Sequence, residues 1–163
     1  MRPTWDETWM NVARAVALRA PCSRARVGAV IVDATNRIIA TGYNGPPAGL
    51  VRPWWYECDG SEAQGGFCIR GKHGPQGDPT SYADCPSLHA EENALSFCDR
   101  REREHGTIYV TSPTCNSCAK LVANSGLGRI VLLDDSDREY RVAGEWYEFL
   151  EDCGVDVEII KDA

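Results

Sequence analysis

Apolar residues recur every three or four positions across residues 5–19, which is the period of an α-helix. The residues that form this stripe are Trp5, Trp9, Val12, Ala13, Val16 and Ala17. Thr4 stands directly before the stripe and is one of the residue types that most often cap helix N-termini. The pattern therefore predicts an amphipathic first helix with Thr4 as its N-cap.

Two short apolar runs, at residues 27–32 and 37–42, follow this stripe. Between them stands Asp33-Ala34-Thr35-Asn36, a connector rich in turn-forming residues. Runs of this length on either side of a turn are typical of a β-hairpin. Two antiparallel strands are therefore expected to begin the sheet.

Helical and strand patterns alternate from residue 87 onwards. Helices are predicted over residues 88–100, 115–124 and 146–152, and strands over 107–110, 129–133 and 155–160. Ser87 is placed to cap the first of these helices, and Gly126 to end the second in the left-handed conformation. The order α-β-β-α-β-α-β-α-β predicts a three-layer α/β/α fold, in which helices cover both faces of a five-stranded mixed sheet.

Residues 45–84 interrupt this alternation with Gly, Pro, Trp, Cys and charged residues that follow no sustained period. A loop of this length in a compact domain is usually functional or held by something other than a hydrophobic core. Its Trp54-Trp55-Tyr56 cluster is expected to pack, either at a subunit interface or in a local mini-core. At 163 residues, the chain is interpreted as a single domain, 1–163, that carries this long Cys-containing insertion.

The net charge of the chain and the lengths of its apolar runs limit the binding partners and the cellular location that we expect. The 17 Lys and Arg against 24 Asp and Glu give a net charge of −7, which disfavours binding to a long polyanion. The longest apolar runs have the length of strands and fall far short of a membrane span. Residues 1–7 lack the apolar core of a signal peptide and include acids that a transit peptide avoids. We therefore expect no nucleic-acid partner, no membrane partner and a cytoplasmic location.

The 8 cysteines are better assigned to metal and core positions than to disulfides, since no export signal is recognised. Cys98 and Cys153 have no close Cys or His neighbour in the sequence. Both are interpreted as buried thiols that behave as small hydrophobic side chains.

The strongest chemical signal is His89-Ala90-Glu91, followed further along by Cys115-Asn116-Ser117-Cys118. One imidazole and two thiolates are typical zinc ligands, and three protein ligands leave a fourth tetrahedral position open for water. Zinc in such a site lowers the pKa of its bound water towards neutrality. The pairing is a known signature of zinc-dependent base deaminases. We therefore expect one catalytic Zn²⁺, with His89, Cys115 and Cys118 as its ligands.

Glu91 is not needed as a ligand, which leaves its carboxylate available for acid–base chemistry. It lies on the same first helical turn as His89, where it is placed to take a proton from water and to return protons to a ring nitrogen and a departing amine. Glu92 points about 100 degrees further round the helix and is interpreted as a solvated side chain. The reaction inferred is hydrolytic replacement of an exocyclic amine by oxygen, with release of ammonia.

Two interpretations without catalysis compete with this one. A purely structural zinc site normally closes all four positions with Cys or His from two neighbouring pairs, which the motif does not provide. A zinc-stabilised binding module that has lost catalysis has no need of Glu91 beside an open metal position. The motif therefore favours an enzyme over either alternative.

Segments spread over nearly the whole chain, apart from the insertion, match one known family. They are Trp5-Asp6-Glu7, Met10-Asn11-Val12-Ala13, Cys22-Ser23, Val27-Gly28-Ala29-Val30, Thr41-Gly42-Tyr43-Asn44-Gly45, His89-Ala90-Glu91-Glu92-Asn93-Ala94, Tyr109-Val110-Thr111, Ala119-Lys120 and Ser125-Gly126. With them the chain resembles the cytidine deaminase superfamily and, within it, most closely the deoxycytidylate (dCMP) deaminases. The resemblance implies a cytidine-deaminase-like fold, zinc ligands and a proton shuttle at the motif residues named above, and conversion of dCMP to dUMP in pyrimidine nucleotide metabolism.

The resemblance also implies contacts to the substrate. Asn44 is expected to contact the deoxyribose, because an amide offers both a donor and an acceptor, and the backbone at Ala90 is expected to contact the pyrimidine edge. The alternative for Asn44 is that it caps the turn into Gly45. A monophosphate needs cations, and Arg24 and Arg26 flank the approach to the first strand, although exposed arginines are usually just solvated.

The same resemblance also implies how the chain assembles and how it is regulated. Members of the family form homo-oligomers, commonly hexamers, and some are activated by deoxycytidine triphosphate (dCTP) and inhibited by thymidine triphosphate (dTTP). The resemblance therefore implies a homohexamer and an effector site at Gly45, Pro46 and Gly49.

Relatives in the family can also carry a second, structural zinc in the region of the insertion. We expect its ligands to be Cys22, Cys58, Cys68 and Cys85, although their spacings are irregular and unlike a Cys-x-x-Cys pair. A closed site of thiolates suits a loop too polar to form its own core. His73 in place of one cysteine, or ordinary thiols with no metal, are the alternatives.

Two departures from the family pattern lie in the second half of the motif. The usual proline directly before the first paired cysteine is Thr114 here, with Pro113 displaced by one position, and the residue after that cysteine is Asn116. These departures remove no ligand but alter the loop that faces the base, so they leave the substrate open. The rivals are a tRNA adenosine deaminase, which the acidic balance disfavours, and a deaminase of another cytosine nucleotide, a free nucleoside or a base.

Overall fold

The computed structural model describes residues 2–22, 25–47, 87–134 and 144–161. Within these ranges the helices are α1 (Trp5–Ala17), α3 (Ala90–Ser96), α4 (Arg100–Arg103), α5 (Asn116–Ala123) and α6 (Gly144–Asp152), and the strands are β1 (Gly28–Val32), β2 (Ile38–Tyr43), β3 (Thr107–Val110), β4 (Arg129–Leu133) and β5 (Asp156–Ile160). The strands form one sheet in the order β2-β1-β3-β4-β5. Strand β1 is antiparallel to β2 and β3, whereas β3, β4 and β5 are parallel, so the predicted five-stranded mixed sheet is confirmed.

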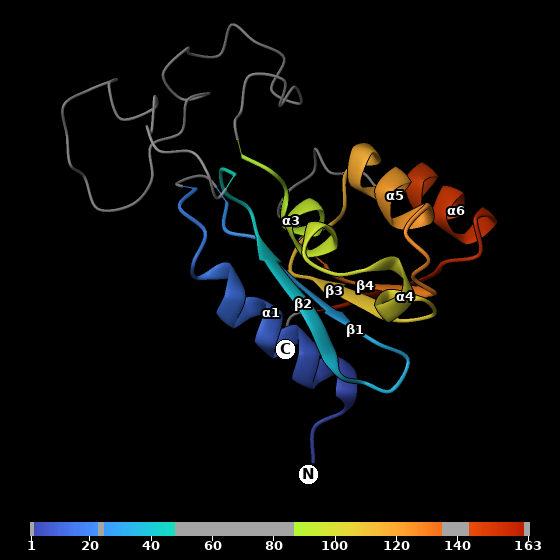
Figure 1. Ribbon diagram of the computed structural model, residues 1–163, viewed down its shortest axis with the longest axis horizontal. Coiled ribbons are helices and arrows are strands. Elements are labelled where there is room, and N and C mark those ends of the chain that lie inside the picture. The colour runs from blue at the N-terminus through green and yellow to red at the C-terminus, as the bar shows by residue number, and fades with distance from the viewer. Residues whose placement is uncertain (1, 23–24, 48–86, 135–143, 162–163) are drawn as a thin grey trace, which may run out of the picture.

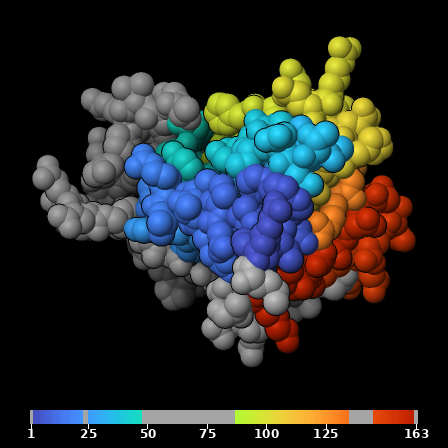
Figure 2. All heavy atoms as spheres, turned by 90° about the horizontal axis from the view of Figure 1, so that it is seen from below, coloured from blue at the N-terminus to red at the C-terminus, as the bar shows by residue number. Residues whose placement is uncertain are grey.

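Helices cover both faces of this sheet, with α1 on one side and α3, α5 and α6 on the other (Figure 1). The α1 side buries Met10, Ala13, Val30, Val32, Tyr109, Val131 and Leu133. The opposite side buries Ala29, Ile31, Ile108, Val110, Ile130 and Leu132 with residues of the other helices. Strand β1 is buried along its whole length because it is covered on both faces. Figure 2 shows the molecule from the α1 side, with the blue residues of α1 facing the viewer. The predicted three-layer α/β/α arrangement is confirmed.

The helix predicted over residues 88–100 was wrong at both ends. Leu88 forms a β-bridge with Gly45, through N–H···O distances of 2.9 and 3.2 Å, and is therefore not available to the helix. Helix α3 begins one residue after His89, which is the N-cap in place of Ser87. The chain leaves the helix after α3 and starts a separate short helix, α4. A long-range backbone bridge thus overrides the local apolar pattern.

Capping groups set the ends of the other helices as expected. The Thr4 hydroxyl accepts a hydrogen bond from the Glu7 backbone N–H at 3.1 Å, which confirms the predicted N-cap of α1. The Glu102 carboxylate accepts from the Asp99 backbone N–H at 3.0 Å and begins α4. Gly126 has a φ of 92° after α5, which confirms the predicted left-handed stop.

Two glycines let helices approach the hairpin closely. A Cβ atom on Gly28 would lie 2.0 Å from the Ala13 carbonyl oxygen of α1, and one on Gly42 would lie 2.2 Å from the Ala90 carbonyl oxygen of α3. These distances are far below van der Waals contact, so any side chain at either position would push a helix away. Helix α3, which begins beside His89, is therefore seated directly on β2.

The helices of the described ranges are short. The longest, α1, has 13 residues, whereas a membrane-spanning helix needs about 20 apolar residues. None of the helices that the structure describes is long and apolar enough to cross a bilayer.

An ion-pair network joins α1 to the centre of the sheet. The Arg129 guanidinium donates to both carboxylate oxygens of Asp6, at 2.8 and 2.9 Å, and the Tyr109 hydroxyl donates to Asp6 Oδ1 at 2.8 Å. Arg129 also pairs with Glu158 on β5. The hydrogen bond from Arg129 lowers the pKa of Asp6, against the opposing effect of partial burial. Asp6 thus connects the first helix to β3 and β4.

Substituting Asp6→Asn is expected to lower the free energy of unfolding at pH 7 by about 1–2 kcal/mol, because a charge-assisted hydrogen bond to Arg129 is lost at a partly exposed site. Since the folded-state pKa of Asp6 is lowered, the difference from wild type is present above the pKa of an unfolded Asp, about 3.9. It is lost as the pH falls through the folded-state pKa. Urea unfolding across pH 3 to 7 measures this. The exposed Asp152→Asn is the control, and an equal loss in both variants contradicts the role of the network.

Candidate metal centre and active site

Two helix N-termini carry the two halves of the metal motif. His89 is the N-cap of α3, and Cys115 is the N-cap of α5. The bridge between Gly45 and Leu88 holds the chain just before His89, and the cysteine pair follows the central strand β3. Because α3 and α5 lie on the same face of the sheet, the two motif segments meet there (Figure 1).

The spacing of the three ligand atoms fits zinc. The ligand atoms of His89, Cys115 and Cys118 all lie within 4.8 Å of one another. His89 Nδ1 is 3.4 Å from Cys115 Sγ and 3.4 Å from Cys118 Sγ. Tetrahedral zinc with ordinary bond lengths places nitrogen and sulfur ligands about 3.6 Å apart. The three groups therefore have both the chemistry and the separation for one zinc ion, with His89 coordinating through Nδ1.

Hydrogen bonds within this ligand set shift its pKa values. A hydrogen bond with Cys118, together with one from His89, lowers the pKa of the Cys115 thiol to about 3 against the effect of burial. The shared hydrogen bond and burial raise the pKa of Cys118, and the hydrogen bond with Cys115 raises the pKa of His89. The three groups thus share one hydrogen-bonded cluster, and metal binding to it requires the thiols to lose their protons.

The Glu91 carboxylate lies beside these ligands and is almost fully buried, with 4% of the residue exposed. Burial raises the pKa of this carboxyl, although its own backbone N–H, His89 and the Thr114 hydroxyl oppose the rise. Thr114 Oγ1 donates to Glu91 Oε1 at 3.0 Å. A carboxyl with a raised pKa is a better base and remains an acid nearer to neutral pH. The geometry therefore supports Glu91 as the group that moves protons.

Two residues next to Glu91 have structural roles that the sequence interpretation missed. Glu92, interpreted as solvated, accepts a hydrogen bond at Oε2 from the His89 backbone N–H at 2.7 Å and so caps α3. The Asn93 side-chain amide donates to the Tyr43 carbonyl at 2.6 Å and ties α3 to the end of β2. A Glu three residues after an N-cap is a known capping pattern, and that signal points to Glu92.

The side chain of Asn44 forms hydrogen bonds to the backbone just before β1. Its Oδ1 accepts from the Val27 backbone N–H at 2.7 Å, and its Nδ2 donates to the Ala25 carbonyl at 2.9 Å. These contacts differ from the alternative in which Asn44 caps the turn into Gly45. An amide can make further hydrogen bonds through its second N–H and second lone pair, so the predicted contact to a sugar hydroxyl stays a prediction.

The other predicted site residues lie in different environments. Ala90 is fully buried at the start of α3, and Arg26 is exposed shortly before β1. Gly45 is buried and Pro46 is half-buried beside it, and Cys22 is half-buried after α1. Six predicted site residues and the aromatic cluster lie outside the described residues: Arg24, Gly49, Cys58, Cys68, His73, Cys85 and 54–56.

The two cysteines expected to be buried thiols differ from that expectation. Cys98 is half-buried, and its sulfur accepts from Arg103 Nη1 at 3.4 Å. Cys153 is exposed, so its prediction as a core thiol was wrong. It follows the last residue of α6, where the chain turns through Gly154 at a φ of 81° and the sulfur faces solvent instead of the sheet.

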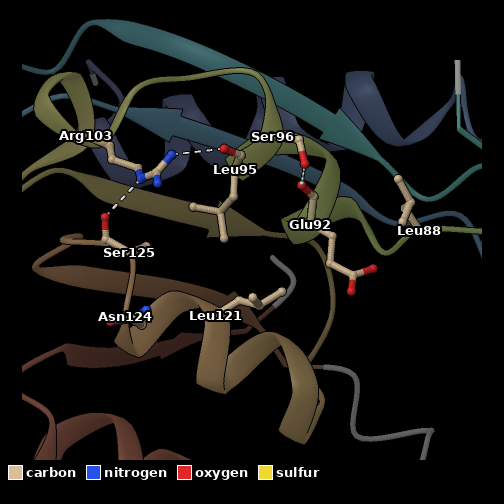
Figure 3. A pocket seen from close by; sticks show the side chains of 8 residues that line it. All are labelled: Leu88, Glu92, Leu95, Ser96, Arg103, Leu121, Asn124 and Ser125. Atoms are coloured by element: carbon tan, nitrogen blue, oxygen red, sulfur yellow. Dashed lines mark hydrogen bonds between the residues drawn. The ribbon is translucent and has the colours of Figure 1, made fainter.

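A shallow cavity of about 400 Å³ opens between α3 and α5, as Figure 3 shows. Its lining residues are Leu88, Glu92, Leu95, Ser96, Arg103, Leu121, Asn124 and Ser125. Arg103 spans one wall by donating to the carbonyls of Leu95 and Ser125, each at 3.0 Å. The lining includes neither Glu91 nor a zinc ligand, so this cavity is not the place where the reacting groups converge.

The variant Cys118→Ser is expected to lose one equivalent of zinc per chain, because a hydroxyl is a poor substitute for a thiolate ligand. Metal analysis of purified wild type and variant by mass spectrometry measures the loss. The exposed Cys153→Ser, which removes a thiol far along the chain from the motif, serves as the control and keeps the wild-type zinc content. An unchanged zinc content in Cys118→Ser contradicts the ligand assignment.

Comparisons with known proteins agree with this geometry. Residues 3–134 match the family model for the cytidine and deoxycytidylate deaminase zinc-binding region. The chain is similar to the deoxycytidylate deaminase of Mycobacterium phage D29, with 38% identity over 139 residues that cover 83% of this chain and 98% of the phage protein. It is also similar to the deoxycytidylate deaminase of Saccharomyces cerevisiae, with 34% identity over 158 residues that cover 96% of this chain and 45% of the yeast protein.

A solved structure shows the same fold. The dCMP deaminase from cyanophage S-TIM5, in complex with dCMP and dUMP, aligns with a TM-score of 0.67 and 24% identity over 98% of this chain and 99% of that one. The predicted cytidine-deaminase-like fold is thus confirmed. The family model spans most of the chain and includes both halves of the zinc motif, and the phage D29 relative is matched over nearly its full length. The chain belongs to the cytidine and deoxycytidylate deaminase family.

Proposed function

We propose that this chain is a zinc-dependent hydrolase that converts dCMP and water to dUMP and ammonia, in pyrimidine deoxynucleotide metabolism. The observation that carries the proposal is the buried Glu91 carboxylate beside three donors spaced for zinc. The relatives from phage D29 and yeast, both named deoxycytidylate deaminase, support the choice of substrate.

In the proposed mechanism, His89 would hold the metal through Nδ1, and Cys115 and Cys118 through their sulfur atoms. Zinc bound there supplies a Lewis acid that lets water ionise near neutral pH. Glu91 takes one proton from the attacking water and passes it to the ring nitrogen, and then takes the second proton from the hydroxyl left on the ring carbon and gives it to the departing amine, which leaves as ammonia. Glu92 keeps the backbone of His89 in place through its capping hydrogen bond. One carboxylate thus acts as base and then as acid.

The proposal extends to the substrate contacts. Asn44 contacts the deoxyribose with the amide groups that remain beyond its bonds to Val27 and Ala25. The backbone at Ala90, next to both His89 and Glu91, contacts the pyrimidine edge. Arg26, which is exposed before β1, and Arg24 contact the phosphate.

The proposed setting is a single domain, 1–163, that works in the cytoplasm as a homohexamer. It responds to dCTP and dTTP through Gly45, Pro46 and Gly49, and a second, structural zinc binds Cys22, Cys58, Cys68 and Cys85. The family supports the oligomer and the effectors, and the half-buried Cys22 is compatible with the second metal. Metal analysis distinguishes the possibilities for zinc: wild type contains two ions per chain if the second site exists and one if it does not.

The variant Glu91→Gln is expected to keep its fold and its zinc but to lose about 10²-fold to 10⁴-fold in kcat, because an amide cannot carry the proton. Ammonia release from dCMP, zinc content and thermal unfolding are measured together. The exposed Glu148→Gln is the matched control and turns over as wild type does. Normal turnover by Glu91→Gln contradicts the assignment of the proton shuttle.

The substrate is tested with wild type alone. Ammonia release is followed from dCMP, CMP, deoxycytidine, dCTP and an RNA hairpin that contains adenosine. The highest kcat/KM is expected for dCMP. A preference for deoxycytidine overturns the phosphate contacts, and a preference for the hairpin supports the rival tRNA adenosine deaminase.

A further inference from the structure

A buried threonine contacts the carboxylate that moves the protons. Thr114 lies in the loop between β3 and α5 and is 3% exposed. Its hydroxyl donates to Glu91 Oε1 at 3.0 Å, and both residues are buried. A hydroxyl has a single proton to donate, and here that proton goes to the carboxylate.

This hydrogen bond adds to the contact of the Glu91 carboxylate with its own backbone N–H and restricts the torsion that sets the plane of the carboxylate. The last torsion of a glutamate is broad, so the carboxylate plane is not set by rotamer preference. A threonine is stiff at χ1, because its Cβ carries two heavy atoms. The bond from Thr114 therefore transfers the rigidity of the loop to the carboxylate of Glu91.

The same hydrogen bond connects the two halves of the metal centre. Thr114 directly precedes Cys115, and Glu91 follows closely after His89 on α3. The Glu91 carboxylate is thus held by the segment that carries Cys115, whereas its backbone belongs to the segment that carries His89. Both segments therefore fix the position of the carboxylate relative to the zinc ligands.

We propose that Thr114 is a positioning residue for the deamination, which holds the Glu91 carboxylate in the orientation that the proton transfers require. The inference rests on the proposed function. A general base must lie about 2.6–3.2 Å, between heavy atoms, from the group whose proton it takes, and the proposed mechanism requires this of Glu91 with several partners in turn. Without the hydrogen bond from Thr114, the Glu91 carboxylate occupies other orientations for part of the time. Loss of this hydrogen bond therefore lowers kcat, while KM and metal binding do not depend on it.

The neighbouring Thr111 provides a matched control. Its hydroxyl accepts a hydrogen bond from the Gly28 backbone N–H at 3.0 Å, which joins the same loop to the start of β1. The variants Thr111→Val and Thr114→Val make the same chemical change three positions apart, but only Thr114 contacts Glu91. Thr111→Val is expected to lower the melting temperature without lowering kcat.

The test measures kcat and KM for dCMP, zinc content and melting temperature in zinc-loaded full-length protein. Thr114→Val is expected to lose about 10-fold to 100-fold in kcat, the effect of one hydrogen bond to a charged group, with KM and zinc content as in wild type. Thr114→Ser, which keeps the hydroxyl, recovers most of this loss. If Thr114→Val does not fold, Thr114→Ala lacks the hydroxyl too and takes its place with the same expectation.

A double variant adds an independent criterion. Thr114→Val in the Glu91→Gln background is expected to be no slower than Glu91→Gln alone, because the threonine acts only through the carboxylate. Wild-type kcat in Thr114→Val, a loss that follows zinc content, or additive losses in the double variant overturn the inference and leave the proposed function intact. A zinc-loaded wild type that releases no ammonia from any compound of the substrate panel overturns both.

Discussion

The structure depends on the burial of one carboxylate, that of Glu91, beside three metal-binding side chains. Burying an ionised carboxylate is costly unless hydrogen bonds or opposite charges compensate for the lost water. Here the backbone N–H of Glu91 and the Thr114 hydroxyl compensate in part. Burial nevertheless raises the pKa of the carboxyl. A raised carboxyl pKa is what the proposed acid–base role of Glu91 requires.

Such a centre needs a frame that holds two distant segments together, and the hairpin with its neighbour β3 provides it. Gly42 lets α3 rest directly on β2, and the bridge from Gly45 holds the chain just before the histidine. The cysteine pair follows β3, which pairs with β1 of the same hairpin. Both halves of the metal motif therefore lie on the frame that β2, β1 and β3 form, which brings their ligand atoms within zinc-binding distance.

The sheet and the ligand set could be predicted because their signals are local in sequence: apolar periodicity indicates each strand, and short spacings mark the zinc motif. The start of α3 at Ala90 could not, because it depends on the bridge between Leu88 and Gly45 across the insertion. The prediction of a solvated Glu92 was wrong, because a Glu three residues after the N-cap can turn back to the backbone whatever face of the helix it lies on. The hydrogen bond between Thr114 and Glu91 joins segments far apart in the chain, and no sequence pattern indicates it. The exposed Cys153 shows that cysteine type alone does not indicate burial.

We propose that three protein ligands hold one zinc ion and leave the buried carboxylate of Glu91 uncoordinated. Anomalous diffraction at the zinc edge, from crystals of the zinc-loaded protein, tests this arrangement. We expect a peak at about 2.0–2.1 Å from His89 Nδ1 and about 2.3 Å from the sulfur atoms of Cys115 and Cys118, with a non-protein fourth ligand. A peak that Glu91 or a fourth protein side chain coordinates would contradict it, as would the absence of zinc at these residues.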